Sequence, residues 1–284
     1  MKKMSRGQRI WKMLTGRKYR QIVVGVGMFS VILICAIFAP LIAHQDPSFY
    51  DVPNRMLPPS SAHLFGTDVF GRDVFARTIY GARTSLAISV SVTVLCGVVG
   101  IFLGLIAGYF RRLEAVIMRV MDALMAFPNI LLALIIVAAL GAGAINVIIA
   151  LALASIPSVT RMVRGIVLTV KEQDHVAAAK ASGAKTGRIL FFHIFLLCIS
   201  PITVILTLIL ATTTLAEASL TFLGVGLPPE LPSWGNIISD GRTYISTAWW
   251  LTVIPGFAIL WTVISVNVLG DGVRDMLDPR LRNL

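Results

Sequence analysis

The sequence offers few side chains whose type and spacing could support catalysis or metal binding. The stretch GAKTG, from Gly183 to Gly187, contains a Lys-Thr pair but lacks the spacing and the preceding strand of a phosphate-binding loop. The histidines are scattered along the chain, and the cysteines fall inside apolar runs without the spacing of a metal site or a disulfide framework. We therefore expect no catalytic residue, no metal and no cofactor on this chain. The histidines and cysteines are His44, His63, His175, His193, Cys35, Cys96 and Cys198.

Two places put ionisable groups within or beside apolar runs. Glu217 lies deep in one such run, where an ionised carboxylate costs about 2–3 kcal/mol, so we expect it to face protein or water in a structural role. Asp122 follows Arg119 by three residues, a helical spacing that allows the two side chains to pair. We predict a buried, structural ion pair there, with a role in transport as the alternative.

The elements that must position these residues are membrane spans. Hydrophobic residues make up 56% of the chain, charged residues 14%, and the mean hydropathy is +0.83, as in a polytopic membrane protein. Crossing the bilayer takes roughly 20 apolar residues. The sequence predicts an all-α fold with six transmembrane helices, at about 22–43, 84–110, 116–140, 144–169, 194–226 and 247–270.

Basic residues set the expected orientation, because Lys and Arg are retained on the cytoplasmic side. Basic residues retained in the cytoplasmic segments account for the net charge of +11, so no nucleic-acid partner is needed to explain it. Their distribution predicts a multi-pass membrane protein with both termini in the cytoplasm. The expected division is a basic N-terminus (1–21), a first transmembrane helix (22–43), an external loop leading into an interfacial helix (44–83), a five-helix core (84–271) with a cytoplasmic loop (171–192), and a C-terminus (272–284).

Three glycines in the second predicted span share one helical face. Gly100, Gly104 and Gly108 are four residues apart, so a neighbouring helix can approach this face closely. A packing seam in a moving bundle and a static seam both fit the pattern.

The stretch DHVAAAKASGAKTGRILFFHIF, from Asp174 to Phe195, lies in the longest predicted cytoplasmic loop. Its alanines favour a helix, and Gly183 and Gly187 permit a break or a turn. A short helix with small exposed side chains suits insertion into a groove on a soluble partner. The alternative from composition is an amphipathic helix lying on the inner leaflet.

This stretch resembles the cytoplasmic signature loop of bacterial ABC-importer permeases, which carries a Glu-Ala-Ala triplet, a following glycine and a later His-Ile-Leu-Pro run. Ala177 stands where the glutamate is usual, and Phe195-Leu196 replace Leu-Pro. The matching residues are Ala178, Ala179, Gly183, His193 and Ile194. GTDVFGRDVFARTIYGARTSL, MRVMDALMAFPNILLAL, AEASLTFLGVGLPPELPSWG and VNVLGDGVRDMLDPRL resemble, in order, segments of the C-type subunit of the dipeptide/oligopeptide/nickel permease family.

The resemblance implies a type I importer permease of the bacterial inner membrane that forms half of a translocation pathway. Its expected partners are a homologous permease, two cytoplasmic ATPase subunits that hold ATP and Mg²⁺, and an external substrate-binding protein. The cytoplasmic loop then serves as a coupling helix docked on an ATPase subunit. The coupling residues are expected to be Asp174, Ala177, Ala178, Ala179, Gly183, Ala184 and Gly187.

The expected cargo is a di- or oligopeptide, with glutathione or a nickel chelate as alternatives within the same family. A secondary transporter driven by an ion gradient is a further alternative. Such proteins usually show repeated halves and ionisable groups near the midplane. The sequence shows no internal repeat and only Glu217 as a deep ionisable group.

Overall fold

The computed structural model describes residues 17–277, and the regular structure in this range is helical, as predicted. Its polar ends at 1–16 and 278–284, which include most of both predicted cytoplasmic termini, lie outside the described residues. Contacts divide the chain into two compact units. The first runs to Ala87 and resumes at Glu217, and the second is Ile88–Ala216. Helices α4 and α10 each contribute residues to both units.

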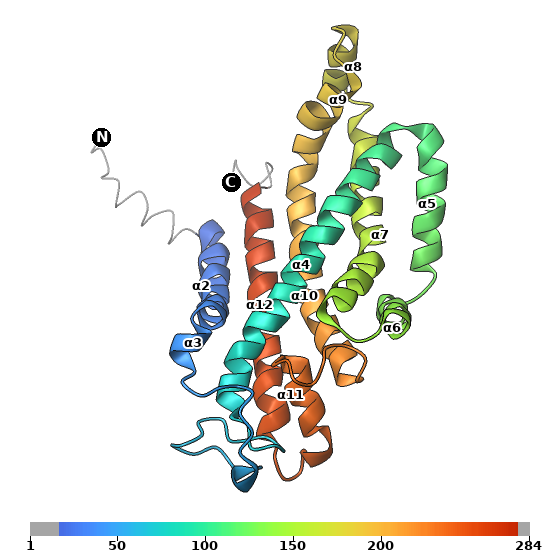
Figure 1. Cartoon of the computed structure of the whole chain (residues 1–284). Helices are drawn as coiled ribbons and strands as arrows, with labels where there is room; N and C mark the ends of the chain where they lie inside the picture. The colour runs from blue at the N-terminus through green and yellow to red at the C-terminus, as the bar shows by residue number, and fades with distance from the viewer. Residues whose placement is uncertain (1–16, 278–284) are drawn as a thin grey trace, which may run out of the picture. The chain divides into compact units, whose positions relative to one another are not determined.

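The helices follow one another along the chain as labelled in Figure 1. They are α2 (Arg17–Ile37), α3 (Ala39–Ile42), η1 (Val52–Asn54), α4 (Val74–Tyr109), α5 (Arg111–Met125), α6 (Asn129–Leu140), α7 (Ala144–Val170), α8 (Asp174–Ala181), α9 (Thr186–Arg188), η2 (Ile189–Ile194), α10 (Phe195–Phe222), α11 (Trp234–Gly241), η3 (Arg242–Tyr244) and α12 (Trp250–Leu277).

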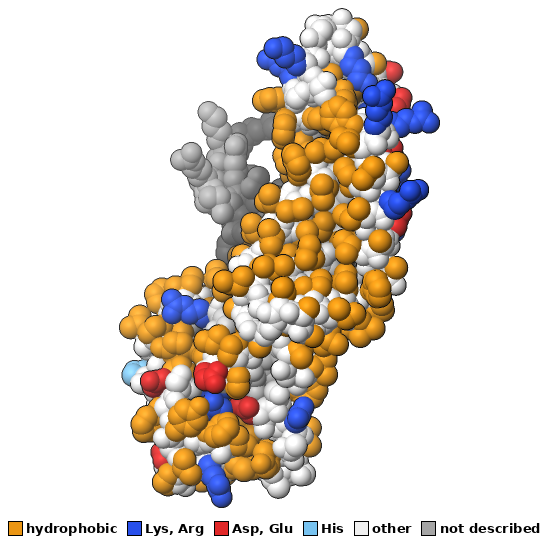
Figure 2. Space-filling view, turned by 45° about the vertical axis from the view of Figure 1, so that its right-hand side comes forward, with side chains coloured by type: hydrophobic (Ala, Val, Ile, Leu, Met, Phe, Trp, Pro, Cys, Tyr) orange, Lys and Arg blue, Asp and Glu red, His pale blue; other side chains and the backbone are white. Residues whose placement is uncertain are grey.

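Five helical segments are long and apolar enough to cross a membrane, and a sixth span results if the bent pair α5 and α6 is counted as one. These numbers refer to the described part of the chain. Figure 2 shows hydrophobic side chains over most of the visible helical surface. Apolar side chains exposed in this way suit contact with lipid or with another apolar chain, so the predicted multi-span class is confirmed.

In the first unit, α2 packs along α12. A Cβ added at Gly25 would lie 2.6 Å from the backbone nitrogen of Leu269, so the two backbones nearly touch there. The indole of Trp261 donates to the carbonyl of Met28 at 3.0 Å. In the same unit, the buried indole of Trp234 in α11 donates to the carbonyl of Thr78 at 3.0 Å. These contacts join α2 to α12 and α11 to the start of α4.

Helix α4 begins earlier than the sequence predicted. The segment 44–83 was expected to hold a loop leading into an interfacial helix, with the next span at 84–110, but α4 is continuous from Val74 to Tyr109. The carboxylate of Asp73 accepts a hydrogen bond from the backbone N–H of Ala76 at 2.8 Å, as a helix N-cap does. This cap explains why α4 starts at Val74, before the apolar run begins.

The third predicted span, 116–140, is broken. Helices α5 and α6 meet at an angle of 89° across a short break that contains Pro128. Proline has no backbone N–H to donate and disfavours a helical conformation in the residue before it, here Phe127. Apolar residues lie on both sides of the break, so hydropathy alone shows the segment 116–140 as one continuous span.

The π-helix η2 joins the short helix α9 to the long helix α10. Its backbone at Ile189–Ile194 has the wider π-helical winding, and the N–H of Phe195 donates to the carbonyl of Leu190, five residues back. Beyond it α10 continues with ordinary α-helical geometry. Ile189 and Ile194 are buried. The predicted span 194–226 therefore begins inside one continuous helical rod that carries the segment α8–α9 at its end.

Candidate functional site

The segment singled out by the sequence forms a short helix with a defined end. Helix α8 exposes Ala177 and Ala178 and buries Val176. At its end, Gly183 adopts a left-handed backbone with φ of +78°. The N–H of Gly183 donates to the carbonyl of Lys180 at 3.0 Å, and that of Ala184 to Ala179 at 3.1 Å, as in a Schellman motif.

The remaining residues predicted for coupling lie around this helix. Asp174 is exposed in its first turn, where its negative charge is favourable. Gly187 is exposed in α9, and an added Cβ would meet no other atom within 4 Å. The structure thus brings the predicted residues together in one small-residue surface, which consists of α8, the turn at Gly183 and α9.

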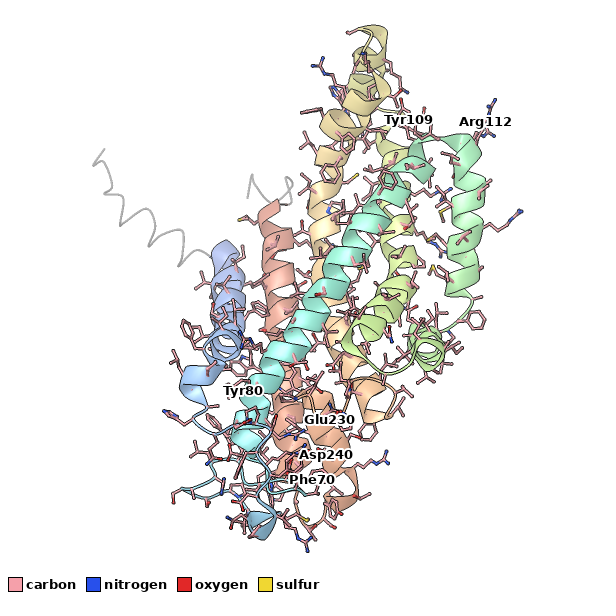
Figure 3. All side chains as sticks on the ribbon, in the orientation of Figure 1. Phe70, Tyr80, Tyr109, Arg112, Glu230 and Asp240 are labelled. Carbon is pink, nitrogen blue, oxygen red and sulfur yellow. The ribbon has the colours of Figure 1, made fainter. Side chains whose placement is uncertain are left out.

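Two lysines connect this surface to the end of α4. The ammonium of Lys180 lies 5.9 Å from the centre of the Tyr109 ring, within range of a cation–π interaction. The ammonium of Lys171 donates to the carbonyl of Gly108 at 3.1 Å. Figure 3 shows Tyr109 at the end of α4, beside Arg112 at the start of α5. Helix α8 is thereby joined to a membrane span by polar contacts as well as through the chain.

The glycine face of α4 packs against α7. Cβ atoms added at Gly100, Gly104 and Gly108 would lie 2.7, 2.6 and 2.5 Å from the Cβ atoms of three valines, closer than real Cβ atoms approach one another. Those valines are fully buried and also recur every four residues. They are Val159, Val163 and Val167. The two helices therefore meet along a continuous small-residue seam, as GxxxG-type packing requires.

The charged residues of α5 pair with α7. The Arg161 guanidinium donates to the Asp122 carboxylate at 2.6 Å, so Asp122 takes this partner and not the predicted Arg119. Both Arg119 and Asp122 are exposed, which corrects their assignment as buried charges. The pairing differs because a guanidinium on the facing helix reaches the carboxylate directly. A second pair, Arg164 with Glu114, joins the same two helices.

Glu217 is fully buried in α10, as its position in the apolar run predicted. The hydroxyl of Thr221 donates to its Oε1 at 3.2 Å. Its Oε2 has no hydrogen-bond partner among the described residues. The contact with Thr221 comes from a protein side chain on the same helix, which agrees with a structural role.

Sequence reasoning missed a buried ion cluster in the first unit. The Arg72 guanidinium donates to Asp68 at 2.6 Å and to Asp240 at 2.7 Å. Arg77 lies 3.4 Å from Asp68 and 3.5 Å from Asp240. Burial raises the pKa of Asp240, and the two guanidinium groups act against that rise. Figure 3 labels Asp240 together with Phe70, whose ring centre lies 4.6 Å from the Arg72 guanidinium.

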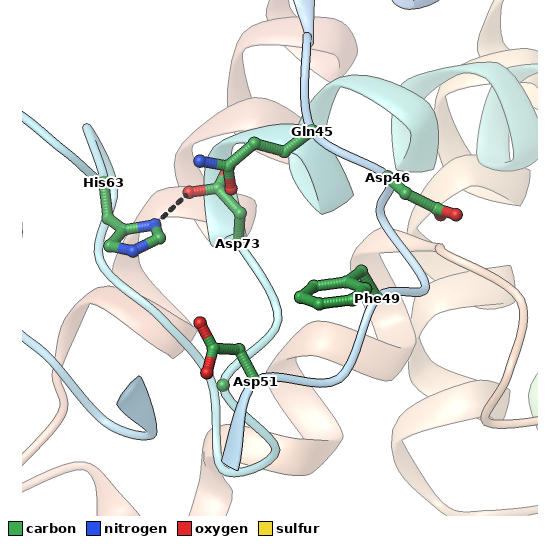
Figure 4. Close-up of a pocket in the computed structure, with 7 residues that line it drawn as sticks. Gln45, Asp46, Phe49, Asp51, His63 and Asp73 are labelled. Carbon is green, nitrogen blue, oxygen red and sulfur yellow. Dashed lines mark hydrogen bonds and ion pairs between the residues drawn. The ribbon is translucent and has the colours of Figure 1, made fainter. Parts of the chain in front are cut away.

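A pocket of about 380 Å³ lies in the same unit and is shown in Figure 4. The Nδ1 of His63 lies 3.0 Å from the Asp73 carboxylate on its wall. Phe49 and three carboxylates line it together with Gln45 and Gly71. The carboxylates are Asp46, Asp51 and Asp73. Across residues 17–277, no group of three or more His, Cys, Asp or Glu side chains is placed to hold a metal ion.

Two family models match the sequence. The first, described as binding-protein-dependent transport system inner membrane component, matches residues 100–283. This range contains the glycine seam, the bent pair α5–α6 and the segment α8–α9. The second, described as the N-terminal transmembrane domain of oligopeptide transport permease C, matches residues 5–59. Together the matches take in most of the chain.

Curated relatives align over nearly their whole length. A dipeptide transport system permease protein of Alkalihalophilus pseudofirmus is 42% identical, over 94% of this chain and 88% of the relative. A di/tripeptide transport system permease protein of Pseudomonas aeruginosa is 42% identical, over 91% and 88%. A glutathione transport system permease protein of Pectobacterium atrosepticum is 38% identical, over 96% and 92%.

Proposed function

The chain belongs to the family of binding-protein-dependent transport system inner membrane components, and from this premise we propose that it is one of two permease subunits of an ATP-driven peptide importer. It is a multi-span membrane permease without a catalytic role of its own. The observation that carries the proposal is the exposed helix α8, held by Lys180 and Lys171 against the end of span α4.

The proposed partners supply the functions that a permease subunit does not perform. ATP and Mg²⁺ are bound by two ATPase subunits, one of which docks on α8, and a homologous permease supplies the other half of the pathway. An external binding protein delivers the cargo. Both termini and α8 face the cytoplasm of the bacterial inner membrane, because the basic residues of the described loops gather at that end of the spans. Alanines on α8 suit a closely fitted groove on the ATPase subunit.

The proposed cargo is a di- or oligopeptide. Support comes from the two relatives at 42% identity, which are named as permeases of a dipeptide and a di/tripeptide transport system. The glutathione relative makes that tripeptide thiol the second candidate. Nickel chelates remain the third, and no metal-ligating cluster among the described residues favours them.

Native mass spectrometry of the complex tests the proposal. The chain is tagged at its N-terminus, extracted gently from its own host and analysed with its associated proteins. We expect a second permease and two ATPase subunits, and uptake of radiolabelled dialanine by the complex in vesicles when the binding protein and ATP are supplied. Recovery of the chain alone or as a homo-oligomer across several mild detergents would contradict the proposal and favour a self-sufficient transporter.

Substitution of Ala178 by Asp is expected to uncouple the importer. Ala178 is exposed on α8, so the added carboxylate does not disturb the permease interior but places a bulky charge in the docking contact. An uncompensated charge at an interface costs several kcal/mol, and we expect dialanine uptake to fall by about tenfold or more. Uptake is measured in vesicles that contain equal amounts of inserted permease.

The matched control is Ala178→Ser, which adds one small uncharged group and should retain uptake. Gly183→Asp tests the same surface at the turn, with additional backbone strain from its left-handed conformation. Normal uptake by a correctly inserted Ala178→Asp protein would rule out close docking at this helix.

A further inference from the structure

The break before α6 leaves a free helix N-terminus among the spans of the second unit. The first α-helical bond runs from the N–H of Leu132 to the carbonyl of Pro128 at 3.0 Å. The N–H groups of residues 129–131 precede this bond and have no partner within the helix. A helix N-terminus carries about half a positive charge, and its free N–H groups favour an anion.

The first turn of α6 lines a small pocket. Asn129 and Ile130 form one wall, and residues of α7 and α10 form the others, namely Leu151, Ala154, Ser155, Thr212, Thr213 and Ala216. The pocket has a volume of about 190 Å³. This is smaller than the 300–1,000 Å³ of typical small-molecule sites, so it can take one group of a ligand but not a whole peptide.

One hydroxyl in the pocket has no partner. The side chains of Thr212 and Ser155 each donate to a carbonyl one turn back in their own helices. Thr213 is only 3% exposed, yet no hydrogen bond joins its hydroxyl to another residue of the described chain. A hydroxyl that lines a pocket and has no protein partner can be satisfied by a ligand placed there.

The pocket wall is also polar without being charged. Asn129, Ser155 and the two threonines contribute amide and hydroxyl groups, while no acidic or basic side chain lines it. Polar groups at membrane depth face protein or a water-filled path, since lipid cannot satisfy them. The combination of free N–H groups, an unused hydroxyl donor and no carboxylate suits an anionic group.

We propose that this pocket holds the carboxylate of the cargo during its passage through the permease. The proposal rests on the proposed function, because a carboxylate at the end of a short peptide is the anion that such an importer moves. The Thr213 hydroxyl and the amide groups at the start of α6 donate to the carboxylate, and the second permease subunit completes the site around the rest of the peptide.

Uptake by Thr213→Val provides the first test. Valine keeps the shape of threonine and removes the donor. We therefore expect the maximal rate of dialanine uptake by the complete importer to fall about tenfold, because one hydrogen bond to a charged group is lost. The KM, set by delivery from the binding protein, should stay unchanged. Thr213→Ser should retain uptake. An unchanged maximal rate in Thr213→Val would overturn the proposal.

The control is Thr207→Val on the same helix. The Thr207 hydroxyl donates to the carbonyl of Val204 at 2.9 Å, and the residue does not line the pocket. Its uptake should match that of the unaltered protein. A loss in Thr207→Val equal to that in Thr213→Val would mean that the hydroxyl acts on the helix and not on the cargo, which also contradicts the proposal.

Thiol labelling tests the anion preference without peptide transport. Thr213→Cys and Thr207→Cys are prepared in a chain whose native cysteines are replaced by alanine, and each is labelled with anionic and cationic methanethiosulfonate reagents in the assembled complex. The anionic-to-cationic rate ratio should be several-fold higher at position 213. Equal ratios, or no labelling at 213, would overturn the carboxylate site. Absence of dialanine uptake by the unaltered complex would instead remove the peptide function, and labelling would still decide the pocket's preference.

Discussion

Asp68→Ala is expected to lower the free energy of unfolding by about 3–5 kcal/mol, the cost of breaking a buried ion pair from one side. The Asp68 carboxylate accepts from the side chain of Arg72 and from the backbone N–H groups of Phe70 and Arg72. Its removal leaves two guanidinium groups, each no more than 2% exposed, with Asp240 as their remaining carboxylate. The loss is measured as a lower melting temperature in detergent and a lower yield of monodisperse protein.

Asp46→Ala is the matched control for this substitution. Asp46 belongs to the same segment but is exposed, and its carboxylate accepts a hydrogen bond from the N–H of Ser48 at 2.8 Å. We expect its melting temperature to stay close to that of the unaltered protein. Asp68→Asn keeps the oxygen that binds the backbone and should lie between the two. Equal melting temperatures for Asp68→Ala and Asp46→Ala would show that the cluster does not stabilise the fold.

Gly104→Val is expected to separate α4 from α7. A Cβ at position 104 would lie 2.6 Å from the Cβ of Val163 and 2.8 Å from the carbonyl oxygen of Thr160, and the backbone oxygen cannot rotate away. Overpacking a close contact costs about 1–3 kcal/mol, and we expect the upper end because the valine adds two further methyl groups. The same measurements of melting temperature and folded yield apply.

Gly165→Ala controls for the loss of a glycine from a helix. Gly165 lies in α7, and an added Cβ would meet no atom within 4 Å. Alanine favours a helix by roughly 0.8–1.0 kcal/mol over glycine, so this variant should melt at the same or a slightly higher temperature. A Gly104→Val protein as stable as Gly165→Ala would mean that the seam relaxes easily, as in a bundle whose helices slide.

Hydropathy alone was sufficient to predict the all-α, multi-span class. Long apolar runs cross the bilayer, and there a single segment can satisfy its own backbone N–H and C=O groups only as a helix. Hydropathy could not place helix ends. Helix α4 starts at Val74 because Asp73 caps it, which is a polar and local signal. The break at Pro128 was visible in the sequence, yet the apolar residues on both sides hid the change of direction that makes a free helix start.

Partners far apart in the chain were the least predictable part of the site. The four-residue spacing of Gly100, Gly104 and Gly108 predicts which face of α4 packs closely, but nothing in it identifies α7 as the neighbour. Asp68 and Arg72 are four residues apart, a local pairing signal that the sequence contains. Asp240, which completes their cluster, comes 168 residues after Arg72 and is brought there only by the fold.

The wider winding of η2 fixes the direction in which the small-residue surface points. An α-helix turns by about 100° per residue, so one residue more or fewer rotates everything beyond it by that angle. The π-helical segment holds such an extra residue between α10 and the α8–α9 surface. The direction in which α8 points is therefore set by residue count. A one-residue deletion between Ile189 and Ile194 would turn the alanine face about a quarter circle while leaving every side chain on that face intact.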